Sequence, residues 1–221
     1  MALGALLAGG FLFALLGNNL FHADSGGTLF SRIFRFTGFT FWCGALGGFF
    51  LFFLIYTVCF RDWQKGVRTF SAVLPYFTLG HAFGRLGCFL SGCCFGRPTH
   101  SFIGVSFPAG SPASLLYGSE KLYPTQLMEL GLLLAISIVL YRTQETERRP
   151  GLYFSIYSAG RFLLECFRGD DRGRYLWLLS PAQGISSVTF FVGLFFLFYG
   201  EREKESATLD RGGNRRKKGK K

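Results

Sequence analysis

Six runs of mostly apolar residues, each about as long as a membrane-spanning helix, constrain the fold of this chain more than any other feature. A helix needs roughly 20 such residues to cross the hydrocarbon core of a bilayer, where it satisfies its own backbone hydrogen bonds. The pattern therefore predicts an all-α integral membrane protein, a polytopic helical bundle with about six spans. The runs cover residues 2–21, 38–60, 70–94, 122–141, 151–167 and 176–199.

The composition agrees with this class of fold. Of 221 residues, 28 are Phe and 30 are Gly, and only 17% are charged. Five of the glycines fall between residues 80 and 96, which predicts close helix contact or a break in the third span. The net charge of +11 does not indicate a nucleic-acid partner, because nine of the 24 Lys and Arg residues lie in residues 201–221. We predict a transmembrane domain over residues 1–200 and a basic, disordered cytoplasmic tail over residues 201–221.

The distribution of Lys and Arg predicts the orientation, because positively charged loops stay in the cytoplasm. With the first residue inside, 15 of them lie on the inner side, seven lie on the outer side, and Arg85 and Arg161 lie within spans. Both ends are then cytoplasmic, and the third span ends at the outer side of a bacterial inner membrane. Residues 98–121 show no helical pattern and are expected to form an outer loop. Residues 1–20 lack a positive start and a cleavage site, so we expect a retained span.

Charged residues inside two of the runs are the first indication of chemistry. An arginine at the centre of a span costs about 2.5–3.5 kcal/mol on insertion scales, so Arg85 and Arg161 need a partner or a polar cavity. His81 precedes Arg85 by four residues, and Arg161 stands four residues after Tyr157 and four before Glu165. This spacing places each set on one helix face and predicts an Arg161–Glu165 ion pair. Two buried guanidinium groups suit phosphate oxygens, so an anionic lipid headgroup is the expected ligand.

Three ordered motifs resemble one known family. Residues 84–99 read GRLGCFLSGCCFGRPT and are similar to the signature of the prolipoprotein diacylglyceryl transferases, G-R-x-G-N-F-x-N-G-E-x-x-G-R. Residues 123–129, YPTQLME, resemble the family's H/Y-P-[ST]-Q-L-Y-E segment, and residues 157–168 resemble its Y-x-x-x-R-x-x-x-E-F-x-R helix.

The resemblance implies a reaction and its partners. A member of this family transfers the diacylglyceryl group of phosphatidylglycerol to the lipobox cysteine thiol of a prolipoprotein, without a cofactor and toward the outer leaflet. Membrane lipids surround the protein, and no nucleic acid takes part. The family's catalytic residues map to His81, Tyr157, Arg161 and Glu165, where His81 takes the place of the missing family histidine as the base. The substrate-binding residues map to Arg85, Gly87, Cys88, Gly92, Cys93, Gly96, Arg97, Gln126 and Glu129.

The chain departs from the family pattern at several positions. The family's S-F-H-G-G-L segment corresponds to residues 40–46, which contain no histidine, and the signature Asn and Glu are replaced by Cys88 and Cys93. The acidic residue that the family carries upstream of the signature falls near Ser71. The family usually has seven spans, and this chain has six predicted ones. The alternative function is therefore a non-catalytic or thiol-active relative that binds anionic phospholipid or a lipoprotein precursor. His81 itself is either the base or a packed, hydrogen-bonded side chain.

The cysteines have three compatible roles. Cys88, Cys93 and Cys94 either fill space as small polarizable residues, act as redox or acyl-carrier thiols, or bind a soft metal. Their C-x4-C-C spacing fits no common zinc pattern, so no metal ligands are assigned in the predicted site. The six cysteines do not form a disulfide framework, because four of them lie in or against apolar runs.

Overall fold

The computed structural model describes residues 39–169, 180 and 182–198, and every regular element in these ranges is a helix. The chain divides into two compact units, residues 1–69 and 70–221, which are described separately. The fold class predicted from the apolar runs, all-α, is confirmed for the described residues.

The first unit contains a helical hairpin. Helix α3 (Phe39–Val58) is followed by a short turn and by the first residues of α4 (Trp63–Leu90), which continues into the second unit. The Asp62 carboxylate accepts a hydrogen bond from the backbone N–H of Lys65 at 2.9 Å, so Asp62 caps the start of α4. The rings of Phe53 and Trp63 lie 4.7 Å apart, and the Tyr56 hydroxyl donates to Thr69 at 3.2 Å. These contacts hold the two helices of the hairpin together.

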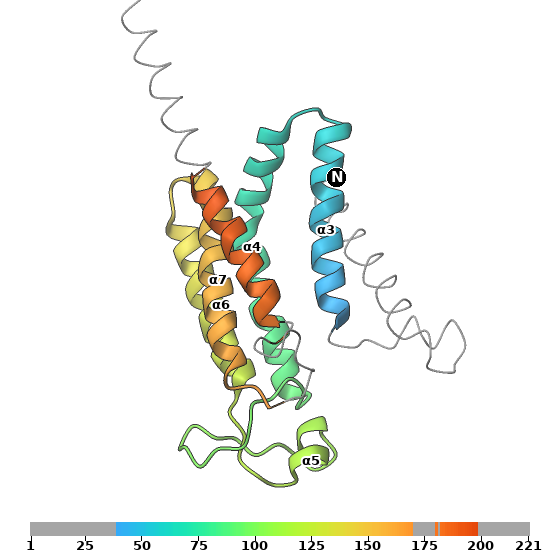
Figure 1. The fold of residues 1–221 in the computed structure, drawn as a ribbon, viewed down its shortest axis with the longest axis vertical. Coiled ribbons are helices and arrows are strands. Elements are labelled where there is room, and N and C mark those ends of the chain that lie inside the picture. The colour runs from blue at the N-terminus through green and yellow to red at the C-terminus, as the bar shows by residue number, and fades with distance from the viewer. Residues whose placement is uncertain (1–38, 170–179, 181, 199–221) are drawn as a thin grey trace, which may run out of the picture. The chain divides into compact units, whose positions relative to one another are not determined.

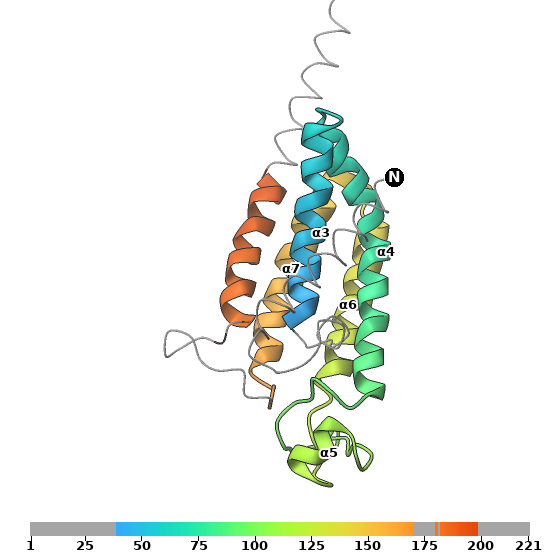
Figure 2. The ribbon, with the colours of Figure 1, turned by 90° about the vertical axis from the view of Figure 1, so that its right-hand side faces the viewer.

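The second unit is a helical bundle. It comprises the rest of α4, α6 (Thr125–Arg142), α7 (Arg149–Glu165) and the apolar helix Ala182–Phe198, with the short 3-10 helix η1 (Thr146–Arg148) between α6 and α7. Figures 1 and 2 show these helices running side by side. Leu74 of α4 and Leu133, Ile136 and Leu140 of α6 are fully buried and form the core. Gly193 lets the last helix approach α7, because a Cβ there would lie 2.5 Å from the Ser155 hydroxyl.

Pro75 interrupts the hydrogen bonding of α4. A proline has no backbone N–H, so the carbonyl of Ser71 loses its partner within the helix. The Arg149 guanidinium donates to that carbonyl at 3.4 Å, and the Ser137 hydroxyl donates to the carbonyl of Pro75 at 2.9 Å. Arg149 therefore supplies the hydrogen bond that the Ser71 carbonyl loses to Pro75, and Ser137 adds a bond from α6 at the same turn.

A small cap of loops and one helix lies at one end of this bundle (Figures 1 and 2). Helix α5 (Pro112–Tyr117) begins at Ser111, whose hydroxyl accepts the backbone N–H of Ser114 at 3.2 Å. Phe95, Phe107, Ala113 and Leu122 form its core. The expectation of an irregular loop over residues 98–121 is wrong in this part, because six residues are long enough for a capped helix although too short for a visible apolar period.

Five of the six predicted spans correspond to helices, and the first, residues 2–21, lies outside the described residues. The third begins earlier than predicted, at Trp63 rather than residue 70, and ends at Leu90 rather than at residue 94. It runs unbroken through Gly80, Gly84 and Gly87, and a Cβ at these positions would meet no atom of the described residues within 4 Å. Within the described residues, these three glycines therefore show neither the predicted close contact nor the predicted break. On length and composition alone, α6 is the one helix in the described ranges suited to crossing a membrane, and Ala182–Phe198 is apolar but shorter.

Candidate functional site

Glu129 joins three helices in the interior of the second unit. It lies in the second turn of α6 and is only 2% exposed. Its Oε1 receives Nη2 of Arg85 from α4 at 3.0 Å and the hydroxyl of Tyr157 from α7 at 2.8 Å. A buried carboxylate needs such partners, because desolvation otherwise costs several kcal/mol. Glu129 is thus a central element of the site, held by two residues far from it in sequence.

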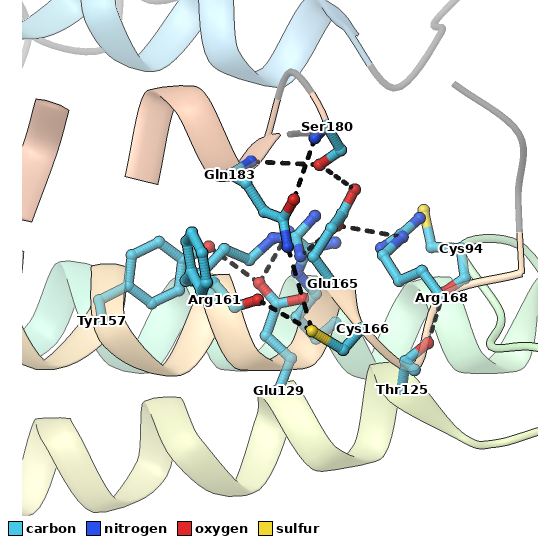
Figure 3. A network of polar contacts seen from close by, with 12 residues as sticks. Cys94, Thr125, Glu129, Tyr157, Arg161, Glu165, Cys166, Arg168, Ser180 and Gln183 are labelled. Atoms are coloured by element: carbon cyan, nitrogen blue, oxygen red, sulfur yellow. Dashed lines mark hydrogen bonds and ion pairs between the residues drawn. The ribbon is translucent and has the colours of Figure 1, made fainter. Parts of the chain in front are cut away.

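Glu165 forms a second polar centre at the end of α7, shown in Figure 3. Its Oε2 lies 2.7 Å from Nη1 of Arg161 and 3.8 Å from Nε of Arg168, and its Oε1 accepts the Ser180 hydroxyl at 2.9 Å. The predicted Arg161–Glu165 pair is confirmed. Gln183 is the second residue of the last helix. Its side-chain oxygen accepts a hydrogen bond from the backbone N–H of Ser180 at 3.0 Å, which helps to position the Ser180 hydroxyl.

Counted over the described residues, the two centres together carry one surplus positive charge. Arg85, Arg161 and Arg168 are opposed by Glu129 and Glu165, and these side chains are all largely buried. The Nε atoms of Arg85 and Arg161 are buried and have no hydrogen-bond partner among the described residues. Each guanidinium thus keeps a donor for another acceptor, and the site as a whole can neutralise one monoanion.

His81 lies beside this network on α4. It is 9% exposed, and its ring meets the Tyr157 ring edge to face at a centroid distance of 5.5 Å. Tyr157 in turn stacks on Tyr153 at 5.7 Å. The imidazole is therefore next to the tyrosine that binds Glu129, and its role as a base stays a prediction.

Gly96 allows three chain segments to meet where α4, α6 and α7 approach one another. Its N–H donates to the carbonyl of Tyr123, and the N–H of Arg97 donates to the carbonyl of Phe167, both at 2.9 Å. A Cβ on Gly96 would lie 2.6 Å from Cβ of Tyr123 and 2.7 Å from the carbonyl oxygens of Tyr123 and Phe167. No side chain fits there without movement of the neighbouring backbone, which explains why this position of the signature is a glycine.

The start of α6 holds the cysteine-containing turn. The Gln126 amide donates to the carbonyl of Cys93 at 2.6 Å, and the Thr125 hydroxyl donates to the carbonyl of Cys94 at 2.9 Å. Gly92 has a φ of 65°, in the left-handed region that glycine adopts readily, and a Cβ there would lie 2.7 Å from Ser111. The turn is therefore built on specific side-chain and glycine contacts.

The structure brings most of the predicted site residues into one unit. Arg85, Glu129, Tyr157, Arg161 and Glu165 belong to the two polar centres, and Gly92, Cys88, Cys93, Gly96 and Gln126 belong to the turn and junction beside them. Gly87 lies on an exposed face of α4. Arg97 is also exposed, with its guanidinium 6.0 Å from the centre of the Phe167 ring. Neither of these two contacts a polar centre in the described residues, and their binding roles stay predictions.

Sequence reasoning missed three contributors, Arg168, Thr125 and Ser180. Arg168 follows Glu165 by three residues, a spacing that brings side chains together on a helix and could have identified it. Thr125 stands in the quoted YPTQLME segment. Ser180 acts across a segment outside the described residues, so no local pattern points to it. The side chains of residues 40–46, where the family histidine is missing, lie outside the described residues.

Comparison with known proteins gives a consistent family. The sequence model of the family described as prolipoprotein diacylglyceryl transferase matches residues 2–199. A phosphatidylglycerol–prolipoprotein diacylglyceryl transferase of Clostridium tetani is 37% identical over 145 residues, which cover 64% of this chain and 57% of the relative. Transferase 2 of Clostridium perfringens is 36% identical, covering 58% and 47%. The enzyme of Chlorobaculum tepidum is 30% identical over 229 residues, covering 97% and 77%. The chain thus spans about half the length of the two clostridial relatives.

Proposed function

Because the chain belongs to the prolipoprotein diacylglyceryl transferase family, we propose that it transfers the diacylglyceryl group of phosphatidylglycerol to the lipobox cysteine of a prolipoprotein. The names of its relatives give both substrates. The single observation that carries the proposal is the buried arginine network of the second unit. Its surplus of one positive charge equals the single negative charge of a phosphodiester, and two of its guanidinium groups keep a buried donor.

The reaction requires few groups from the protein, because the nucleophile belongs to the substrate. The cysteine thiolate attacks the glycerol carbon that bears the phosphate ester. A carbon–sulfur bond forms, the carbon–oxygen bond breaks, and its electron pair leaves on glycerol phosphate. Arg85 and Arg161 stabilise the charge that develops on this leaving group, while Glu129 and Glu165 hold their guanidinium groups in place. The thiol proton passes to a base.

His81 is the proposed base. At pH 7 a thiol with a pKa near 8.5 is only a few per cent thiolate, so either a base or a positive field must raise that fraction. His81 is the imidazole beside the described network. If the arginine field alone is sufficient, loss of His81 leaves transfer nearly intact. If His81 is the base, its loss slows transfer by on the order of a hundredfold or more.

The proposal places the chain in a bacterial inner membrane with six spans, a site toward the outer leaflet and both ends in the cytoplasm. Large apolar side chains point outward from the helices of each unit, among them Phe50, Phe83, Ile138, Leu163 and Phe191. Several polar and charged side chains, among them Gln126, Glu129 and Arg161, lie inside. This distribution supports lipid as the surroundings. The transmembrane transferase-like domain is assigned to residues 1–200 and the basic tail to residues 201–221.

A second function has a specific observation in its favour, namely that residues 40–46 contain no histidine. In this case the protein binds anionic phospholipid or a lipoprotein precursor and transfers nothing. It would retain the arginine network and lack the chemical step.

Transfer from phosphatidylglycerol to a synthetic lipobox peptide distinguishes these functions. We expect activity in the wild type and its loss in Arg161→Gln, because the leaving phosphate then loses a buried donor. The matched control is Arg148→Gln, which removes an arginine from an exposed pair with Glu145 and leaves transfer unchanged. His81→Gln, assayed across pH, decides the base. An inactive wild type that still binds phosphatidylglycerol would favour the non-catalytic function.

A further inference from the structure

Three thiols converge at the end of α4. Cys88 lies in the last turn of the helix, and Cys93 and Cys94 lie in the turn that follows. The three sulfur atoms are all within 4.8 Å of one another, and all three residues are half-buried thiols outside any disulfide. We refer to them as the thiol cluster.

The backbone around the thiol cluster is held from several sides. The N–H of Cys93 donates to the carbonyl of Cys88 at 3.1 Å, which closes the turn. Gln126 and Thr125 occupy the carbonyls of Cys93 and Cys94, so these peptide groups are fixed from α6. Cys94 has a φ of 60°, a left-handed conformation that side-chain-bearing residues seldom adopt. Such local strain persists only where surrounding contacts determine it, and it is concentrated at functional sites.

We propose that the thiol cluster binds one thiophilic divalent metal ion of the Zn²⁺ or Cd²⁺ type through three thiolates. A tetrahedral ion with metal–sulfur bonds of about 2.3 Å holds its sulfur ligands roughly 3.8 Å apart. Side chains within 4.8 Å of one another reach that spacing through small rotations about their χ1 angles. The fourth position is left for water or an external ligand. This proposal does not depend on transferase activity.

The charge balance of the bound state suits its surroundings. Binding one divalent ion to three thiols releases three protons and leaves a complex with one negative charge. Cys88 and Cys94 act electrostatically on the Arg85 guanidinium, and Arg168 acts electrostatically on Cys94. Two guanidinium groups therefore lie near the negative complex, which a buried apolar environment would otherwise disfavour.

The test uses the full-length protein, purified in detergent, fully reduced and free of metal. Titration with Cd²⁺, followed by the sulfur-to-metal charge-transfer absorption, should show one ion per chain. Zn²⁺ added to a separate metal-free sample should bind with three sulfur atoms at about 2.3 Å by X-ray absorption. Cys88→Ser, Cys93→Ser and Cys94→Ser should each weaken binding at least tenfold. Cys59→Ser and Cys166→Ser are the matched controls, because both residues are exposed and outside the cluster, and they should bind as the wild type does.

A second measurement needs no variant. Bound Zn²⁺ should protect Cys88, Cys93 and Cys94 from maleimide, identified by peptide mass spectrometry, while Cys59 and Cys166 react as before. The proposal is overturned if the reduced wild type binds no metal, if binding persists in all three cluster variants, or if Zn²⁺ gives the cluster no protection.

Discussion

At the scale of single residues, Glu129 is where the site and the stability of the bundle depend on the same atoms. One carboxylate oxygen accepts hydrogen bonds from both the Arg85 guanidinium and the Tyr157 hydroxyl. Glu129 is almost fully buried, so water cannot replace the carboxylate if it is lost. A change at Glu129 therefore leaves a buried positive charge, whereas a change at Tyr157 removes one neutral donor.

These two changes predict different costs. Glu129→Gln should lower the free energy of unfolding by about 3–5 kcal/mol, because Arg85 is left buried without a counter-charge. Tyr157→Phe should cost about 1 kcal/mol, the net value of one hydrogen bond. Unfolding in mixed micelles by titration with a denaturing detergent measures both. Equal costs for the two variants would show that Arg85 does not depend on Glu129 for its charge balance.

The predictability of the site also divides at this scale. Arg161 and Glu165 could be paired from their spacing alone, because four residues on a helix bring side chains together. Arg85 and Glu129 could not, since 44 residues separate them and only the packing of α4 against α6 joins them. The C-x4-C-C spacing of the thiol cluster could be read from the sequence. The left-handed backbone conformation of Cys94, which is part of the turn that brings the three sulfur atoms together, could not, because no sequence pattern indicates it.

At the scale of elements, the glycines of the α4 region are not equivalent. Gly84 is exposed on α4 with open space at its Cβ position, whereas Gly96 lies between Tyr123 and Phe167. Composition suggested close helix contact or a break for all of them. Among the described residues, Gly96 has the close contact and Gly84 does not, because the chain segments cross only after the helix ends.

Alanine at these two positions should therefore give opposite results. Gly96→Ala should destabilise the protein by about 1–3 kcal/mol or more, since backbone atoms of two segments would have to move. Gly84→Ala, the matched control, should be neutral or slightly stabilising, because alanine favours the helix. Thermal unfolding followed by circular dichroism compares them. A Gly96→Ala protein as stable as the wild type would contradict the close packing around Gly96.

The position of the helices was more predictable than their ends. Apolar length located α6 to within a few residues, since a run of that size can hardly fold otherwise. The start of α4 was missed because Trp63 to Thr69 are polar enough to resemble a loop, and Asp62 as a cap was overlooked. The start of α5 carried a readable signal, a Ser-Pro pair, that was too short to be used.

At the scale of the whole molecule, the sequence predicts an orientation that the arrangement of helices alone does not provide. The balance of Lys and Arg predicts that the turn before α4 lies in the cytoplasm and that the loops around α5 lie outside. The arginine network lies near the loops that follow α4 in the second unit, because the backbone of Arg168 forms an isolated β-bridge with that of Gly96.

Single introduced cysteines test this orientation in intact cells. In a background with all six native cysteines replaced by serine, His100→Cys should react with an impermeant maleimide, because residue 100 is exposed in the predicted outer loop. Lys65→Cys, also exposed, should react only after the cells are permeabilised. Labelling of Lys65→Cys from outside would invert the topology and place the site at the wrong leaflet for the proposed reaction.

The single surplus positive charge has a consequence for turnover. Phosphatidylglycerol presents a phosphodiester with one negative charge, but the departing glycerol phosphate is a monoester whose second pKa is about 6, so near neutral pH it carries almost two. For the proposed reaction, the product therefore leaves one negative charge uncompensated in a largely buried site, whereas the donor does not. Water solvates that second charge far better than a buried site does, so hydration favours the departure of glycerol phosphate. The charge balance that suits the donor thus also favours release of the product.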